Sequence, residues 1–140
     1  PQFNENTLRD SLHAFQIAYE HIAALGGLRS KARTLDIVIN GFWANKSFHN
    51  YADYALSDSF HAGLRHLIEV GHERRTAIMC SEAVWWRCHR RIVADYLIAS
   101  GQIVFHIMGP DRIEPARLTT GAIVQSNGNI LYPPSQEVET

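Results

Sequence analysis

The sequence lacks both a set of paired cysteines and a long apolar run, and these absences exclude whole classes of protein. Only 2 cysteines occur among its 140 residues, which suits a reducing cytoplasm better than a secreted fold held by disulfides. No apolar stretch approaches the ~20 residues that a transmembrane helix needs, and no secretory signal is present. We therefore expect a cytoplasmic protein that makes no contact with a membrane.

A strong charge bias, internal repeats and low-complexity segments are also missing. The net charge is −1 and the pI is near 6.8, which argues against bulk attraction to nucleic acid but leaves room for a local basic site. The length suits one domain with one core. We predict a single α/β domain over residues 1–134 and a disordered polar tail over 135–140. Because the chain begins at Pro1 and not at methionine, we also expect an N-terminal part to be missing or processed.

Apolar spacing predicts helices in three places. The first is a short amphipathic helix around residues 8–15, and the second follows a cap at Ser57. The third follows residue 91 and ends at Ser100-Gly101. The apolar faces of these helices recur at spacings of three and four, and their members are Leu8, Leu12 and Phe15, then Phe60, Leu64, Leu67 and Ile68, then Ile92, Val93, Tyr96 and Leu97.

Apolar and β-branched runs predict strands at residues 17–22, 76–79 and 103–108. Strand, helix and strand at this length form a βαβ unit, so the last two strands should be parallel. A hairpin is predicted with strands at 122–125 and 129–132 around Asn127-Gly128. The fold class that follows from these elements is α/β, with a mainly parallel sheet and a C-terminal β-hairpin.

Reactive and charged side chains gather in residues 77–91, where a predicted strand ends and a helix begins. Both cysteines of the chain, Cys80 and Cys88, lie in this segment with Glu82 and His89 between or beside them. Ligands of an α/β sheet bind outside the carboxyl ends of its strands. We therefore expect the functional site in this segment.

The arginines at the start of the same helix also predict a bound anion. Cations are disfavoured at a helix N-terminus, yet Arg87, Arg90 and Arg91 stand around the first turns. Such an end requires a carboxylate, which Glu82 would supply, or a bound phosphate-like group. The same field favours cysteine thiolates. In the competing interpretation Glu82 alone neutralises the arginines and both thiols pack as small hydrophobic groups.

Three hypotheses for the site follow from these residue types. In the first, Cys80 or Cys88 is a thiolate nucleophile or redox centre, Glu82 or His89 carries a proton, and Arg90 clamps an anion. The favoured substrate class is a nucleotide or a nucleic-acid end. The sequence does not decide whether the site turns over a substrate, and it names no cofactor.

The second hypothesis is a binding module without turnover, which would contact a nucleotide or nucleic acid through phosphates and stacked bases. Its substrate-binding residues would be Arg87, Arg90, Arg91, Trp43, Trp85, Trp86 and His106. The third hypothesis is zinc binding by Cys80, Cys88, His89 and His106, although the cysteines lack CxxC spacing and Cys88 adjoins His89. We therefore assign no metal ligands. A transient disulfide and a homo-oligomer both remain open.

The motif order resembles a bacterial family known as domain of unknown function 488. The resemblance rests on Met79-Cys80-Ser81-Glu82, Cys88-His89-Arg90 and His106-Ile107, and on further matches that run nearly the whole chain in order. These further matches are Pro1-Gln2-Phe3-Asn4, Leu25-Gly26-Gly27, Trp43 with Asn45 and Phe48, Tyr51-Ala52-Asp53-Tyr54, Arg117-Leu118-Thr119 and Tyr132-Pro133. The resemblance implies that the α/β domain is a Rossmann-like three-layer fold with a mainly parallel sheet. It implies no reaction, because members are largely uncharacterised.

The sequence departs from the family pattern in two places. Members usually begin with a strand, a helix and another strand ahead of the segment that matches Pro1, and that part carries a Gly-His-Ser-like turn and an Asp-Val-Arg-like strand end. The resemblance therefore implies that a central strand and part of the site are absent here. Many members also have a proline between Glu82 and Cys88, where this chain has Val84-Trp85-Trp86.

Overall fold

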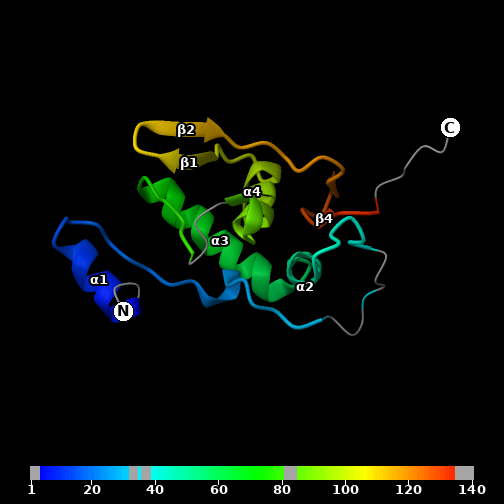
Figure 1. Cartoon of the computed structure of the whole chain (residues 1–140), viewed down its shortest axis with the longest axis horizontal. Coiled ribbons are helices and arrows are strands. Elements are labelled where there is room, and N and C mark those ends of the chain that lie inside the picture. The colour runs from blue at the N-terminus through cyan, green and yellow to red at the C-terminus, as the bar shows by residue number, and fades with distance from the viewer. Residues whose placement is uncertain (1–3, 32–34, 36–38, 81–84, 135–140) are drawn as a thin grey trace.

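The computed structural model describes residues 4–31, 35, 39–80 and 85–134. Helices form the body of the molecule, and the hairpin of β1 and β2 lies at one edge (Figure 1). The α-helices are α1 (Glu5–His13), α2 (Lys46–Tyr54), α3 (Asp58–Glu73) and α4 (Arg90–Ala99), and the 3₁₀ helices are η1 (Ala23–Leu25) and η2 (Trp85–Arg87). The strands are β1 (Phe105–Gly109), β2 (Arg112–Pro115), β3 (Ile123–Val124) and β4 (Ile130–Leu131). None of the helices in these described ranges is long and apolar enough to cross a membrane.

The core lies where α2, α3, α4 and β4 meet. Its buried apolar members are Trp43, Tyr51, Ala52, Ala55, Phe60, Leu64, Leu67, Ile92, Val93, Tyr96, Ile130 and Tyr132. The predicted helix after Ser57 is confirmed as α3, and the Ser57 hydroxyl accepts a hydrogen bond from the backbone of Phe60. The predicted helix that ends at Ser100 is confirmed as α4. Apolar spacing located both helices because each buries one continuous stripe.

The prediction of a Rossmann-like fold with a mainly parallel sheet is wrong. Within the described residues, each sheet has two antiparallel strands, β1 with β2 and β3 with β4. Residues 17–22 and 76–79 contain no strand, so α4 does not connect a parallel pair. Helices and strands do occur together, but no three-layer arrangement is built from them.

The pairing of β1 explains why the βαβ prediction failed. After Gly109 the chain turns at Pro110 and Asp111, and Asp111 has φ 58, a left-handed conformation that aspartate tolerates. The turn brings β2 back onto β1, and closing this short loop costs little chain entropy. β1 is also buried on one face only, since His106 points inward while Phe105 and Ile107 are exposed. An apolar run does not by itself identify the partner strand.

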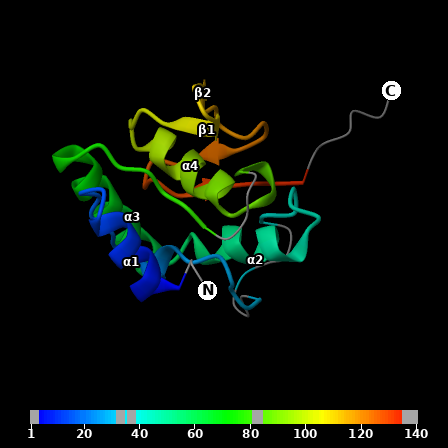
Figure 2. The ribbon, with the colours of Figure 1, turned by 60° about the vertical axis from the view of Figure 1, so that its left-hand side comes forward.

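The predicted C-terminal hairpin is confirmed, with shorter strands than expected. Ile123 pairs with Leu131 and Val124 pairs with Ile130 in antiparallel register. Gly128 has φ 89, a left-handed conformation that favours glycine. The Asn-Gly pair was therefore a reliable hairpin signal. Figure 2 shows the other hairpin, β1 with β2, beside α4.

Two further elements complete the chain. The predicted N-terminal helix is present as α1, but it ends at His13 and buries no residue, and Figure 1 shows it at one edge of the molecule. Helix α2 was not predicted. It begins after Asn45, whose side chain accepts hydrogen bonds from the backbone of Ser47 and Phe48. The predicted disordered tail over 135–140 lies outside the described residues.

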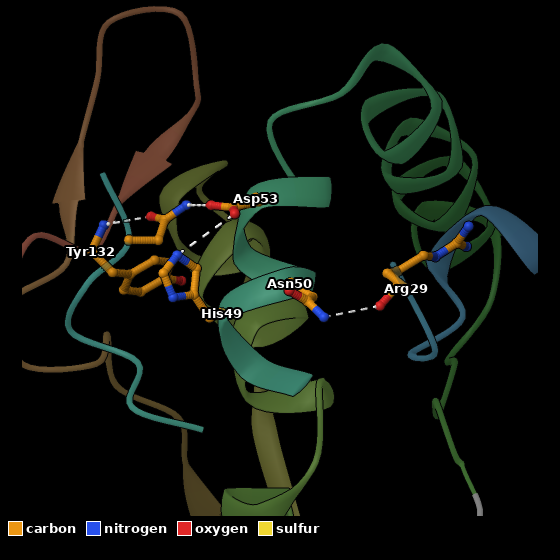
Figure 3. A network of polar contacts seen from close by, with 6 residues as sticks. Arg29, His49, Asn50, Asp53 and Tyr132 are labelled. Carbon is orange, nitrogen blue, oxygen red and sulfur yellow. Dashed lines mark hydrogen bonds and ion pairs between the residues drawn. The ribbon is translucent and has the colours of Figure 1, made fainter. Parts of the chain in front are cut away.

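A buried polar network fixes α2 against the end of the described chain (Figure 3). The amide nitrogen of Asn40 donates to Asp53 Oδ1 at 2.7 Å, and Asn40 Oδ1 accepts from the backbone of Tyr132 at 3.0 Å. His49 lies 3.6 Å from Asp53 Oδ2. At the other side of α2, Asn50 donates to the backbone carbonyl of Arg29. These bonds place α2 so that it can support the site described next.

Candidate functional site

The centre of the site is a contact between the two cysteines. Cys80 ends the extended segment after α3, and Cys88 lies between η2 and α4. Their Sγ atoms are 2.8 Å apart, and each carries a thiol group. Cys88 is only 5% exposed, whereas Cys80 is half-buried. Of the pair, Cys80 is therefore the more exposed residue.

Arg90 holds the sulfur of Cys88 from two directions. Its backbone N–H and its Nε each donate to Cys88 Sγ at 3.3 Å. Burial raises the pKa of the Cys88 thiol and its hydrogen bond with Cys80 adds to the rise, while both bonds from Arg90 lower it. Burial has the larger effect, so the pKa of the Cys88 thiol lies above its usual value and the thiol stays protonated to a higher pH. Burial alone would lower the pKa of Arg90, but the bonds and charges of the two cysteines outweigh this and raise it.

His89 lies against the sulfurs as a neutral imidazole. Its Nδ1 is 3.5 Å from Cys88 Sγ, and its ring packs on Tyr51 with centroids 4.9 Å apart. Burial lowers the pKa of His89, and the charges of Arg90 and Arg29 lower it further. The ring also lies directly over Gly27, where an added Cβ would come within 2.4 Å of Nδ1. Only glycine allows this approach.

The structure thus brings together four of the predicted site residues, Cys80, Cys88, His89 and Arg90. The ligand atoms of the two cysteines and His89 all lie within 4.8 Å of one another, a grouping that could hold a metal ion. Cys88 and His89 are neighbours in the sequence, yet their ligand atoms lie close together, because the chain bends between η2 and α4. Glu82, the other predicted proton carrier, lies outside the described residues.

Three other predicted residues, Trp85, Arg91 and His106, line a neighbouring pocket. The rings of Trp85 and His106 stack with centroids 3.7 Å apart and planes 1° from parallel. Burial lowers the pKa of His106; the carboxylate of Glu114 raises it less, and the charge of Arg90 lowers it further.

The remaining predicted residues are dispersed. Arg87 is exposed, and Trp86 is 43% exposed with its ring edge-on to Trp85. Trp43 is 6% exposed and belongs to the core, where it stacks on Phe48 beneath the guanidinium of Arg91. Sequence reasoning placed all three tryptophans together, whereas the structure gives each a different environment.

Sequence reasoning missed several residues that surround the site. Tyr51 packs on His89, and its hydroxyl donates to the carbonyl of Leu25 at 2.7 Å. Arg29 stacks over Tyr54 and holds the carbonyls of the η1 turn. The signals that could have located them were the Gly26-Gly27 pair and the aromatic run at 51–54. Neither signal reveals its partner in the fold.

The comparisons with known proteins identify the family. A family model described as "Domain of unknown function DUF488" matches residues 1–97, more than half of the chain. The chain belongs to the DUF488 family. No curated protein and no solved structure matches it. The matched part of this DUF488 domain contains both cysteines, His89 and Arg90, and it ends within α4, before His106 and the β1–β2 hairpin.

Proposed function

We propose that this DUF488 domain processes anionic substrates by thiol chemistry at Cys80 and Cys88. One observation carries the proposal: the two sulfurs are 2.8 Å apart and Arg90 donates to one of them. Two thiols in contact can form and break a disulfide without a rearrangement of the backbone. The guanidinium supplies the positive charge that stabilises a thiolate and attracts an anionic group.

The reaction that fits this arrangement is thiol–disulfide exchange. The Cys80 thiolate attacks one sulfur of a substrate R–S–S–R′, which forms a Cys80–S–S–R bond and releases R′S⁻. Cys88 then gives its proton to His89 and attacks the Cys80 sulfur, which forms the Cys80–Cys88 disulfide and releases RS⁻. Two protons from the cysteines end on the two released thiols. The dithiol is oxidised by two electrons, and the substrate disulfide is reduced by two.

The different burial of the two cysteines supports different roles for them in this proposal. Cys80 is the more exposed sulfur and makes the first attack, whereas Cys88 resolves the mixed disulfide from within. His89 Nδ1 lies 3.5 Å from the Cys88 sulfur, and in the tautomer that carries its proton on Nε2 this nitrogen can accept the thiol proton. Arg90 stabilises the negative charge that develops on Cys88.

Reaction with oxidised glutathione, a disulfide that carries carboxylates, tests the proposal. We expect the reduced protein to yield the internal disulfide and two equivalents of glutathione, as measured by mass spectrometry and thiol counting. Cys88→Ser should stop at a mixed disulfide on Cys80. Cys80→Ser should react at least about tenfold more slowly, because Cys88 is shielded. In urea, where burial no longer distinguishes the two sulfurs, the difference between the variants should disappear. Equal rates for the two folded variants, or no internal disulfide in the wild type, would contradict the proposal.

A zinc site is the second candidate function, favoured by the close grouping of Cys80, Cys88 and His89. Thiolate and imidazole are the ligands that zinc prefers in proteins. The charge of Arg90 beside Cys88 opposes a cation there, which places this function second. The same assay separates the two. A zinc protein would resist oxidised glutathione until a chelator is added, whereas the thiol site reacts at once. If neither zinc nor thiol reactivity is found, the non-catalytic binding module is favoured.

A further inference from the structure

The pocket beside the thiols is lined by residues that have no role in the proposed thiol chemistry. It has a volume of about 430 Å³ and lies between the start of α4, strand β2 and the segment that follows β2. This is within the range of small-molecule sites. Its charged members are Arg91, Arg117 and Glu114, and neither cysteine lines it. We infer that this pocket binds a small anion with a planar ring, of the size and chemistry of a mononucleotide.

The charge of the lining favours an anion. Arg91 and Arg117 contribute two positive charges against the one carboxylate of Glu114. Neither guanidinium forms an ion pair with a carboxylate of the described chain, where Glu114 pairs instead with Arg112 at 3.9 Å. His106 stays neutral at pH 7, since burial lowers its pKa, and adds a ring without a charge. A phosphate would place a negative charge between the two arginines and accept hydrogen bonds from both.

Arg91 is already held in place for such a contact. Its guanidinium lies 4.9 Å from the centroid of the Trp43 ring, and its Nε donates to the Thr119 hydroxyl at 3.3 Å. Thr119 is itself fixed, because its backbone N–H donates to the buried Asp95 at 2.9 Å. A side chain ordered before binding loses less entropy when the ligand arrives. Arg117 is exposed and would close on the ligand from the other side.

The apolar part of the lining suits a ring. Trp85 and His106 form a flat, parallel stack, and Pro115 and Leu118 complete the apolar surface. Trp85 Nε1 is buried with no acceptor among the described residues, so stacking and not a hydrogen bond sets the orientation of the indole. Base–aromatic stacking of this kind stabilises bound bases in nucleic-acid sites whatever the identity of the base. A pocket lined by a stacked aromatic pair and two arginines offers the contacts that a base and a phosphate require.

Isothermal titration with adenosine 5′-monophosphate tests the inference on the full chain. We expect binding of the nucleotide, with affinities for adenosine and for inorganic phosphate each at least about tenfold weaker, because each lacks one of the two contacts. Arg117→Gln should weaken binding of the nucleotide about tenfold or more. Arg65→Gln, an exposed arginine on α3, is the matched control and should bind as the wild type does.

Several results would overturn the inference: no binding of the nucleotide at millimolar concentration, equal affinity for adenosine, equal affinity for inorganic phosphate, or no effect of Arg117→Gln. Since Arg117 is exposed, its replacement should leave the fold intact, which circular dichroism can check. Cys80→Ser should keep the full affinity for the nucleotide. The nucleotide-binding inference can therefore be refuted while the thiol chemistry is confirmed, and the reverse also holds.

Discussion

At the scale of single residues, the balance of effects at Cys88 decides whether the site is reactive. Burial and the neighbouring thiol raise the pKa of Cys88, and the two hydrogen bonds from Arg90 lower it. The sum lies on the side of the protonated thiol, because the desolvation of a buried charge is the larger effect. Arg90 thus limits how far burial raises the pKa of Cys88. Replacement of Arg90 should therefore change how the reactivity of the thiol depends on pH.

We expect Arg90→Gln to raise the pH at which the cysteines become reactive. The glutamine side chain carries no charge, so the thiolate loses its cationic donor while the backbone bond to Cys88 remains. The measurement is the rate of alkylation by iodoacetamide against pH, with single-cysteine variants to assign each sulfur. Arg87→Gln, which changes an exposed arginine in the same segment, should leave the profile unchanged. A profile that does not move in Arg90→Gln would mean that the guanidinium does not govern the thiol.

At the scale of elements, the sequence predicted those parts whose signal is local. Helix α3 and the β3–β4 hairpin carry their own caps and turns, at Ser57 and at Asn127-Gly128, and both were found. The segment 76–79 has the composition of a strand, but strand formation needs a partner, and none of the described chain pairs with it. Composition reports the preference of a segment and not the identity of its neighbour.

Helix α2 was missed for a related reason. Its aromatic side chains, which include Phe48 and Tyr51, resembled a loop cluster, and the cap that begins the helix is a single asparagine.

The candidate site was predicted only in part, because only some of its contacts are local in the sequence. Cys88, His89 and Arg90 are consecutive, so their grouping is local, whereas the contacts of His89 with Gly27 and Tyr51 depend on the tertiary fold.

The cap of α2 gives the prediction at this scale. We expect Asn45→Ala to lower the free energy of unfolding by about 1 kcal/mol, because alanine cannot accept the backbone N–H groups of Ser47 and Phe48. Asn45→Asp, which keeps the acceptor, should restore most of the loss. Urea denaturation followed by circular dichroism measures both. Equal stabilities of the alanine variant and the wild type would show that this cap does not stabilise α2.

At the scale of the whole molecule, buried titratable groups make stability depend on pH. His89 lies beside the thiols and His106 lines the pocket, and burial lowers the pKa of both below 6.5. The native state therefore binds fewer protons than the unfolded chain just below pH 6.5. Asp95 acts in the opposite sense, since burial raises its pKa above 3.8 although Thr119 and Tyr132 donate to it.

The contribution of His106 to the free energy of unfolding can be isolated, because it changes with pH in the opposite direction from that of Asp95. Because the folded-state pKa of His106 lies below its unfolded value of 6.5, its neutral form stabilises the fold above that value, and the contribution is lost as the pH falls toward the folded-state pKa. We expect His106→Gln to reduce the decline in the free energy of unfolding between about pH 7.5 and 5.5. His21→Gln, at an exposed position, should keep the wild-type decline. Asp95 contributes equally to all three proteins, so it cancels when their urea midpoints are compared across pH. A His106→Gln variant with the full wild-type decline would show that this ring is not held neutral by the fold, and the pocket would then carry a third positive charge at acidic pH.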